Sequence, residues 1–96
     1  MPKLVRDRIP ELFGGVARPL GEADFRAALR EKLREETQEF LDSGDVTELA
    51  DVLEVVYALA AQDGVSPAAL EALRAAKARE RGGFHARLWW APDLEN

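Results

Sequence analysis

The apolar positions of this chain recur at helical spacing over much of its length. Phe25, Leu29, Leu33 and Phe40 follow one another at intervals of four, four and seven residues. Residues at these intervals lie on one face of an α-helix, so they form a stripe that packs against a neighbouring element. The pattern predicts a helix over about residues 22–41.

Two further helices are expected, because turn and capping residues divide the rest of the chain. A second apolar-rich segment predicts a helix over residues 46–62, with Asp45 as its N-cap. Ser66 followed by Pro67 is typical of a helix start, since proline is favoured at the first helical position. This third helix is expected to end near residue 80. The intervening turns and the final stop lie at residues 42–45, 63–64 and 82–83.

The second predicted helix is apolar around well over half of its circumference, which one neighbouring helix cannot bury. We therefore expect an all-α fold, an antiparallel helical bundle of three main helices per chain that is completed by oligomerisation, as a homodimer or tetramer. Outside these helices, residues 16–20 and 84–90 are each expected to form a short strand or an extended arm. Residues 92–96 are expected to be a tail.

The composition fits one globular domain over residues 1–96, with 47% hydrophobic and 32% charged residues. The absence of cysteine excludes disulfides and zinc–thiolate sites. A net charge of −5 argues against a nucleic-acid partner, which normally meets a basic surface. The N-terminus has no apolar run suited to a signal peptide, and no segment approaches the length of a membrane span. A cytoplasmic protein without a membrane partner is the expectation.

Carboxylates fall where the first predicted helix should bury apolar side chains. At about 100° per residue, Glu36 lies inside the stripe of Leu29, Leu33 and Phe40. Glu39 lies at one edge of this stripe, while Glu35 lies further toward solvent. The first helix therefore singles out Glu36 and Glu39.

The second predicted helix repeats this arrangement. Glu48 falls inside its apolar arc and Asp51 at the border, whereas Glu54 points away. Each pair, Glu36 with Glu39 and Glu48 with Asp51, has the i, i+3 spacing that shares one helix face. Because a short turn makes the helices antiparallel neighbours, the four acids are expected to converge. Converging carboxylates repel one another and favour a hard divalent cation such as Mg²⁺, Mn²⁺ or Ca²⁺. The alternative is a solvated acidic face paired with Lys32 and Arg34.

These acids form the pattern E-E-x-x-E, eight residues, then E-x-x-D. On a helical hairpin this pattern resembles the all-α nucleotide pyrophosphohydrolase superfamily, which includes MazG, the dimeric dUTPases and phosphoribosyl-ATP pyrophosphohydrolase. Residues 3–11 look like the opening of small MazG-like proteins, and Lys77 with residues 81–84 looks like their end.

The resemblance implies a Mg²⁺-dependent hydrolase, with Mn²⁺ as an alternative, that cleaves the α–β bond of a nucleoside triphosphate to give the monophosphate and pyrophosphate. Its implied role is house-cleaning, with phosphoribosyl-ATP as the alternative substrate. Glu35 and Glu36 would be catalytic, Glu35 as an additional ligand or as the group that orients the attacking water. The implied metal ligands are Glu36, Glu39, Glu48 and Asp51.

Several basic residues are candidates for binding the substrate phosphates, each with a structural alternative. Lys32 lies one turn before Glu36 and would contact either a phosphate or the carboxylates. The remaining candidates are Arg6, Arg8, Lys77 and Arg81. Two other functions stay open from the sequence: a dimeric helical module that binds nucleotide or metal without turnover, and a purely structural helical dimer.

Overall fold

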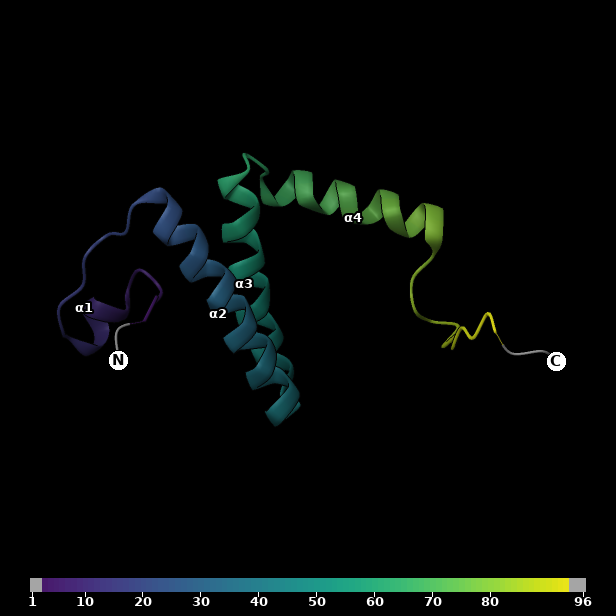
Figure 1. The fold of residues 1–96 in the computed structure, drawn as a ribbon, viewed down its shortest axis with the longest axis horizontal. Helices are drawn as coiled ribbons and strands as arrows, with labels where there is room; N and C mark the ends of the chain where they lie inside the picture. The colour runs from purple at the N-terminus through teal and green to yellow at the C-terminus, as the bar shows by residue number, and fades with distance from the viewer. Residues whose placement is uncertain (1–2, 94–96) are drawn as a thin grey trace.

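The computed structural model describes residues 3–93, and within this range the chain is all-α, without strands. Figure 1 shows two long helices lying side by side, a third helix that projects from them, and a short helix near the N-terminus. The predicted all-α fold is thus confirmed. The helices are α1 (Ile9–Phe13), α2 (Glu22–Ser43), α3 (Val46–Gln62) and α4 (Pro67–Arg81).

The tight turn between α2 and α3 results from two local capping interactions. Gly44 adopts a left-handed conformation (φ 67°), and its N–H donates to the carbonyl of Phe40, which closes the last turn of α2. The Asp45 carboxylate then accepts a hydrogen bond from the backbone N–H of Thr47 at 2.9 Å and so caps α3. The two helices are therefore antiparallel neighbours, as the sequence predicts.

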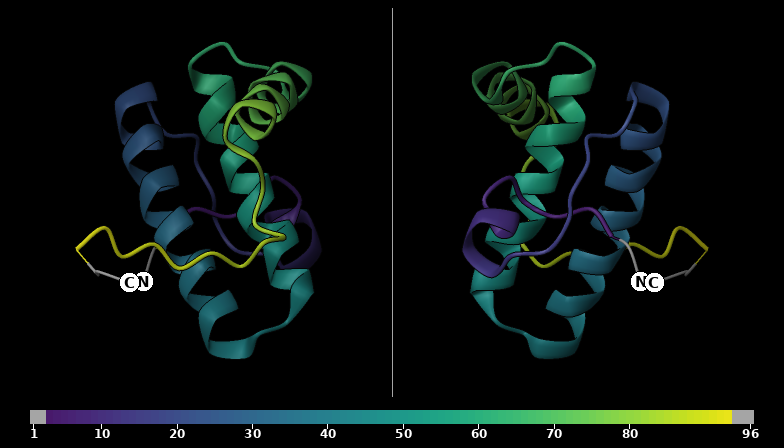
Figure 2. Two further views of the ribbon diagram at one scale, coloured as in Figure 1. Left: turned by 90° about the vertical axis from the view of Figure 1, so that its right-hand side faces the viewer. Right: turned by 90° about the vertical axis from the view of Figure 1, so that its left-hand side faces the viewer.

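Helix α4 starts at a cap of the same kind but leaves the hairpin. The Ser66 hydroxyl accepts from the N–H of Ala69 at 3.1 Å, and Pro67 occupies the first turn. Helix α4 then extends away from α2 and α3, and the following segment turns aside at its end before it runs further outward (Figure 1). The molecule consequently measures 60 × 31 × 23 Å, and the two views of Figure 2 look along its long axis.

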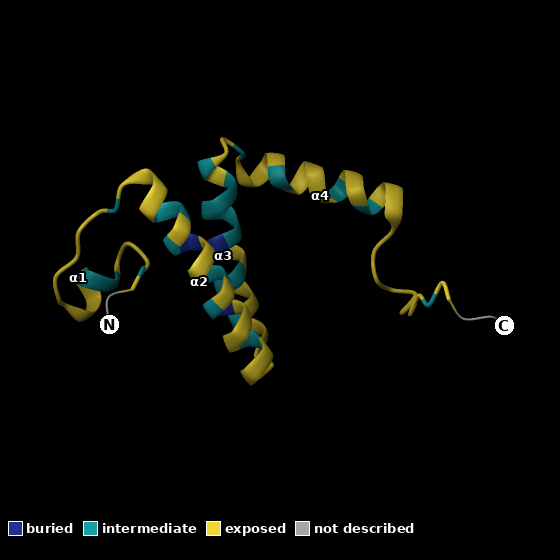
Figure 3. Ribbon diagram, viewed as in Figure 1, coloured by how far each residue is buried: buried dark blue, intermediate teal, exposed yellow. Residues whose placement is uncertain are grey.

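The hydrophobic core of the single chain is small. Among the described residues, the buried apolar side chains are Leu29 on α2 and Val55 on α3, and Figure 3 shows the buried positions on these two neighbouring helices. The chain exposes 8675 Å², whereas a folded monomer of this mass exposes about 5,500 Å². Its radius of gyration is 17.6 Å, against about 12–13 Å for a compact chain of this length.

The structure adds one helix that was not predicted and decides between strand and arm for two segments. Helix α1 was not expected. A turn precedes it, in which the Ile9 N–H donates to the Arg6 carbonyl, and Pro10 lies in its first turn. Residues 16–20 and 84–90 are extended or irregular rather than strands, so the arm alternative holds for both. Of the expected tail, residues 94–96 lie outside the described range.

None of the described helices combines the length and the apolar character needed to cross a membrane.

Candidate metal centre

Glu36 is a carboxylate in the buried interface between α2 and α3. The residue is 8% exposed, which makes it the buried charged residue of the described chain. It lines a cavity of about 300 Å³ together with Leu29, Asp51 and Val55. An ionised carboxylate in such a place needs a compensating positive charge, because removal from water disfavours its charged form.

Glu36 joins two groups of acids that come from different helices. In the first group, Glu35, Glu36 and Glu39 of α2 each offer a carboxylate oxygen, and these oxygens lie within 4.8 Å of one another. In the second group, Glu36 meets Glu48 and Asp51 of α3 within the same limit. From helix geometry Glu35 is expected to point toward solvent, but its long side chain brings a carboxylate oxygen to the first group.

Neighbouring negative charge and removal from water raise the pKa of two members of this cluster. The pKa of Glu39 is raised chiefly by the charge of Glu36, and a hydrogen bond between the two carboxyl groups adds to the effect. The pKa of Glu48 is raised first by its removal from water and then by the neighbouring charge of Asp51. The acids therefore lack sufficient positive charge from the protein, which is the electrostatic condition that favours a bound cation.

Lys32 supplies part of this positive charge. Its ammonium nitrogen lies 3.4 Å from a carboxylate oxygen of Glu35 and 3.4 Å from one of Glu36. The Lys32 side chain is only 16% exposed, so its charge is held against the acids. Of the two roles that the sequence left open, this geometry is that of a carboxylate partner.

Arg6 supplies a second positive charge from the N-terminal segment. Its guanidinium donates a hydrogen bond to the carboxylate of Asp51. Leu4 and Val5, which precede it, line the same cavity as Glu36, so the segment runs along this face of the hairpin. Asp51 is therefore held by an arginine that any cation would have to displace or accommodate.

The other basic candidates lie away from the acid groups of Glu35, Glu36, Glu39, Glu48 and Asp51 in the same chain. Arg8 pairs with Glu11 at 3.4 Å on α1. Lys77 and Arg81 are exposed on α4, which contacts α3 and projects from the hairpin (Figure 1). Within one chain, the acids are thus approached by Lys32 and Arg6 but not by these three residues.

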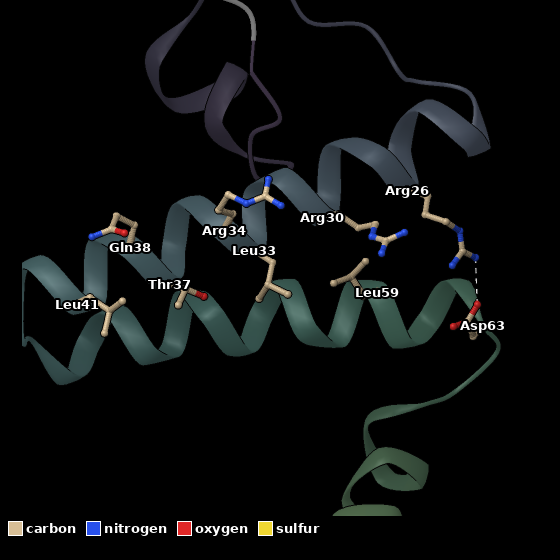
Figure 4. Close-up of a pocket in the computed structure, with 9 residues that line it drawn as sticks. All are labelled: Arg26, Arg30, Leu33, Arg34, Thr37, Gln38, Leu41, Leu59 and Asp63. Atoms are coloured by element: carbon tan, nitrogen blue, oxygen red, sulfur yellow. Dashed lines mark hydrogen bonds and ion pairs between the residues drawn. The ribbon is translucent and has the colours of Figure 1, made fainter.

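A second hollow, which the sequence analysis did not single out, lies along α2 and α3. We call it the arginine groove. It has a volume of about 670 Å³ and carries three arginines of α2 at every fourth position (Figure 4). The four-residue spacing of these arginines is visible in the sequence and could have indicated a basic face on this helix. The residues that line it are Arg26, Arg30, Leu33, Arg34, Thr37, Gln38, Leu41, Leu59 and Asp63.

The acid cluster presents only carboxylate oxygens as ligands, which suits Mg²⁺, Mn²⁺ or Ca²⁺ better than softer metals. Comparison of the chain with protein-family models, with curated proteins and with solved structures finds no match. The chemistry of the site therefore has to be argued from its own residues.

Proposed function

We propose that this protein is a Mg²⁺-dependent nucleotide pyrophosphohydrolase that converts a nucleoside triphosphate to the monophosphate and pyrophosphate. The observation that carries the proposal is Glu36, a buried carboxylate shared by two acid groups on adjoining helices. A purely structural helix pair gains nothing from this placement, because burying and clustering carboxylates lowers stability. The pattern's resemblance to all-α nucleotide pyrophosphohydrolases supplies the reaction type.

In this proposal Glu36, Glu39, Glu48 and Asp51 hold the metal. Bound Mg²⁺ would neutralise the phosphate oxygens and lower the pKa of a bound water. Glu35, whose side chain is 40% exposed and lies beside Lys32, would orient a water molecule from the solvent side of the cluster. Lys32 stays against Glu35 and Glu36 and fixes their side chains. Substrate hydrolysis then depends on positioning and charge neutralisation more than on covalent chemistry.

Self-association belongs to the same proposal. The chain exposes about 3,000 Å² more than a compact monomer of its mass would. Specific interfaces typically bury about 1,200–2,000 Å² in total, so the excess is large enough for a homodimer or tetramer. Lys77 and Arg81 are exposed on the projecting α4, from which they would reach a substrate bound at another subunit.

The test is pyrophosphate release from a panel of nucleoside triphosphates and phosphoribosyl-ATP, measured with the purified protein and Mg²⁺. We expect Glu48→Gln to lower the rate by about 100-fold or more, since it removes a ligand charge from the metal. Glu31→Gln is the matched control, because Glu31 is an exposed α2 acid paired with Arg34 outside the cluster.

The outcomes separate the alternatives. If no nucleotide yields pyrophosphate, but Mg²⁺ raises the melting temperature of wild type and not of Glu48→Gln, the site binds metal without turnover. If neither protein responds to Mg²⁺ and neither releases pyrophosphate, the acids are a structural feature and the proposal fails.

A further inference from the structure

The segment that follows α4 carries four large apolar side chains that the chain leaves in water. We call residues 84–93 the aromatic arm. Phe84, Leu88, Trp89 and Trp90 are each at least 84% exposed, with Phe84 at 98%. An aromatic side chain buries about 150–250 Å² when it is covered. The arm therefore has the composition of an interface and not of a solvated linker.

The arginine groove has the complementary surface. Its floor is apolar, with Leu33 and Leu59 between the two helices, while Arg26, Arg30 and Arg34 extend from α2 (Figure 4). The negative face of an indole ring attracts a guanidinium, and arginine stacks on tryptophan more readily than other cations do. A groove of leucines bordered by arginines thus matches tryptophan in both its apolar and its electrostatic character.

One arginine of the groove lacks an acidic partner within the described chain. Arg26 is paired with Asp63 at 3.0 Å, and Arg34 is paired with Glu31 at 2.8 Å. Arg30 makes no ion pair or side-chain hydrogen bond with any residue in the range 3–93. The arm offers one acid, Asp93, three residues after Trp90.

The other hollow on the hairpin is a poor match for the arm. It is lined by Glu36, Asp51 and Glu54, and its apolar wall is already approached by Leu4 and Val5 of the N-terminal segment. Carboxylates repel the negative faces of aromatic rings, so tryptophans favour the basic groove over the acidic one. The arm cannot easily reach the groove of its own chain either, because α4 carries it away from α2 and α3 to one end of the molecule (Figure 1).

We propose that the aromatic arm of one copy docks into the arginine groove of a second copy, so that Trp89 and Trp90 stack against Arg30 and cover Leu33 and Leu59. A twofold arrangement places each arm in the other copy's groove, which closes the dimer. The three aromatic side chains of each arm would cover about 450–750 Å². Two arms, with the groove surface they cover, reach the size of a specific interface. Docking of the arm rests on the self-association proposed above, but it does not depend on nucleotide hydrolysis.

The protein contains its own reporter, since its two tryptophans are both in the arm. The experiment follows tryptophan emission against protein concentration, together with the mass from sedimentation. We expect emission typical of exposed indole at the lowest concentrations and a blue shift that coincides with dimer formation. Arg30→Asp should weaken the dimer by about tenfold and delay the blue shift to higher concentration.

Two further variants keep the test specific. Arg18→Asp makes the same charge change at an exposed residue outside the groove, and it should behave like wild type. In the docked arrangement Asp93 of the arm would supply the acid for Arg30 of the other copy. The double variant Arg30→Asp with Asp93→Arg should therefore recover part of the lost association, because it restores this pair with the charges exchanged. Circular dichroism checks that each variant keeps its helices.

Three results would overturn the proposal. One is emission that stays that of exposed indole at concentrations where the mass is that of a dimer, which places the interface elsewhere. Another is a blue shift that is complete in the monomer, which means that the arm docks on its own chain. The third is association of Arg30→Asp equal to that of wild type, which removes the groove from the interface.

Discussion

The guanidinium of Arg6 donates a hydrogen bond to the carboxylate of Asp51, 45 positions further along the chain. This contact brings the N-terminal segment onto the face of the hairpin that carries the acid cluster. It also places a fixed positive charge on one of the proposed metal ligands. Arg6 and a bound metal ion would therefore compete for the Asp51 carboxylate.

Replacement of Arg6 should tighten metal binding. In Arg6→Gln, the Asp51 carboxylate is released from its competing cation, and we expect the Kd for Mg²⁺ or Mn²⁺ to fall by up to about fivefold, the range of an exposed ion pair. Calorimetric titration without nucleotide measures this Kd. Arg8→Gln is the control, because Arg8 pairs with Glu11 instead. An unchanged or weaker affinity in Arg6→Gln would contradict the interpretation.

Replacement of Lys32 should destabilise the protein in a way that depends on metal. In Lys32→Met the Glu36 side chain, 11% exposed, loses its nearest cation. We expect the free energy of unfolding to fall by about 1–3 kcal/mol without metal. In Mg²⁺ the loss should be smaller, since the bound cation supplies the missing charge. Urea unfolding with and without Mg²⁺ measures both values.

The control for Lys32 is Arg34→Met, which removes an exposed pair with Glu31. Its effect should stay below about 0.5 kcal/mol and should not depend on Mg²⁺. Equal destabilisation of Lys32→Met in both conditions would show that the ammonium and the metal do not act on the same acids.

The acid cluster should make the metal-free protein less stable as the pH rises. The pKa of Glu39 is raised in the folded state, above its ordinary value of 4.5, so the folded chain holds this proton more tightly than the unfolded chain does. The repulsion is absent below pH 4.5, grows as the pH rises through the raised pKa, and stays constant above it. The substitution Glu39→Gln removes this repulsion.

We therefore expect Glu39→Gln to melt a few degrees above wild type at pH 7 without metal, and at the same temperature as wild type near pH 4. Thermal melts followed by circular dichroism test this difference. Added Mg²⁺ should stabilise wild type more than the variant, because the variant has lost a ligand. A melting temperature of the variant below that of wild type at pH 7 would refute the repulsion argument.

The N-cap at Asp45 should affect both the stability of the protein and its affinity for Mg²⁺. Hydrogen bonds from the Thr47 N–H and hydroxyl lower the pKa of Asp45. This stabilisation is present above the ordinary value of 3.8 and is lost as the pH falls through the lowered pKa. Asp45→Ala should lower the melting temperature at pH 7 and weaken Mg²⁺ binding, because the turn holds Glu48 and Asp51 beside α2.

Asp45→Asn serves as the matched variant, since asparagine also caps helices but does not titrate. It should keep most of the stability and of the Mg²⁺ affinity, while its melting temperature loses the part of the pH dependence below 4 that Asp45 contributes. If Asp45→Ala binds Mg²⁺ as tightly as wild type, the cap does not set the geometry of the ligands.

Local chemistry explains why the helices could be predicted closely. The second predicted helix, residues 46–62, has the same bounds as α3, and the first ends two residues before α2 does. Asp45, Gly44 and Ser66 act through hydrogen bonds to residues within four positions, so their effect is readable in the sequence. Helix α1 was missed because five residues are too few for an apolar period to appear.

The acid cluster was predictable in part for the same reason. Glu36 with Glu39 and Glu48 with Asp51 follow from helix geometry and a short turn, and each pair lies in one of the two acid groups. Helix geometry placed Glu35 toward solvent, whereas its carboxylate lies in the first acid group. The direction of a backbone bond does not fix the end of a long, flexible side chain. Self-association and the metal remain predictions.

By itself, the sequence determined the helices, their turns and the pairing of acids on one side of a hairpin, since all of these depend on spacing over a few residues. The tertiary structure decided which cations meet those acids. It brings Arg6 to Asp51, sends Lys77 and Arg81 away on α4, and leaves Trp89 and Trp90 in water. Such relationships depend on the path of the chain between distant residues, which no local spacing encodes.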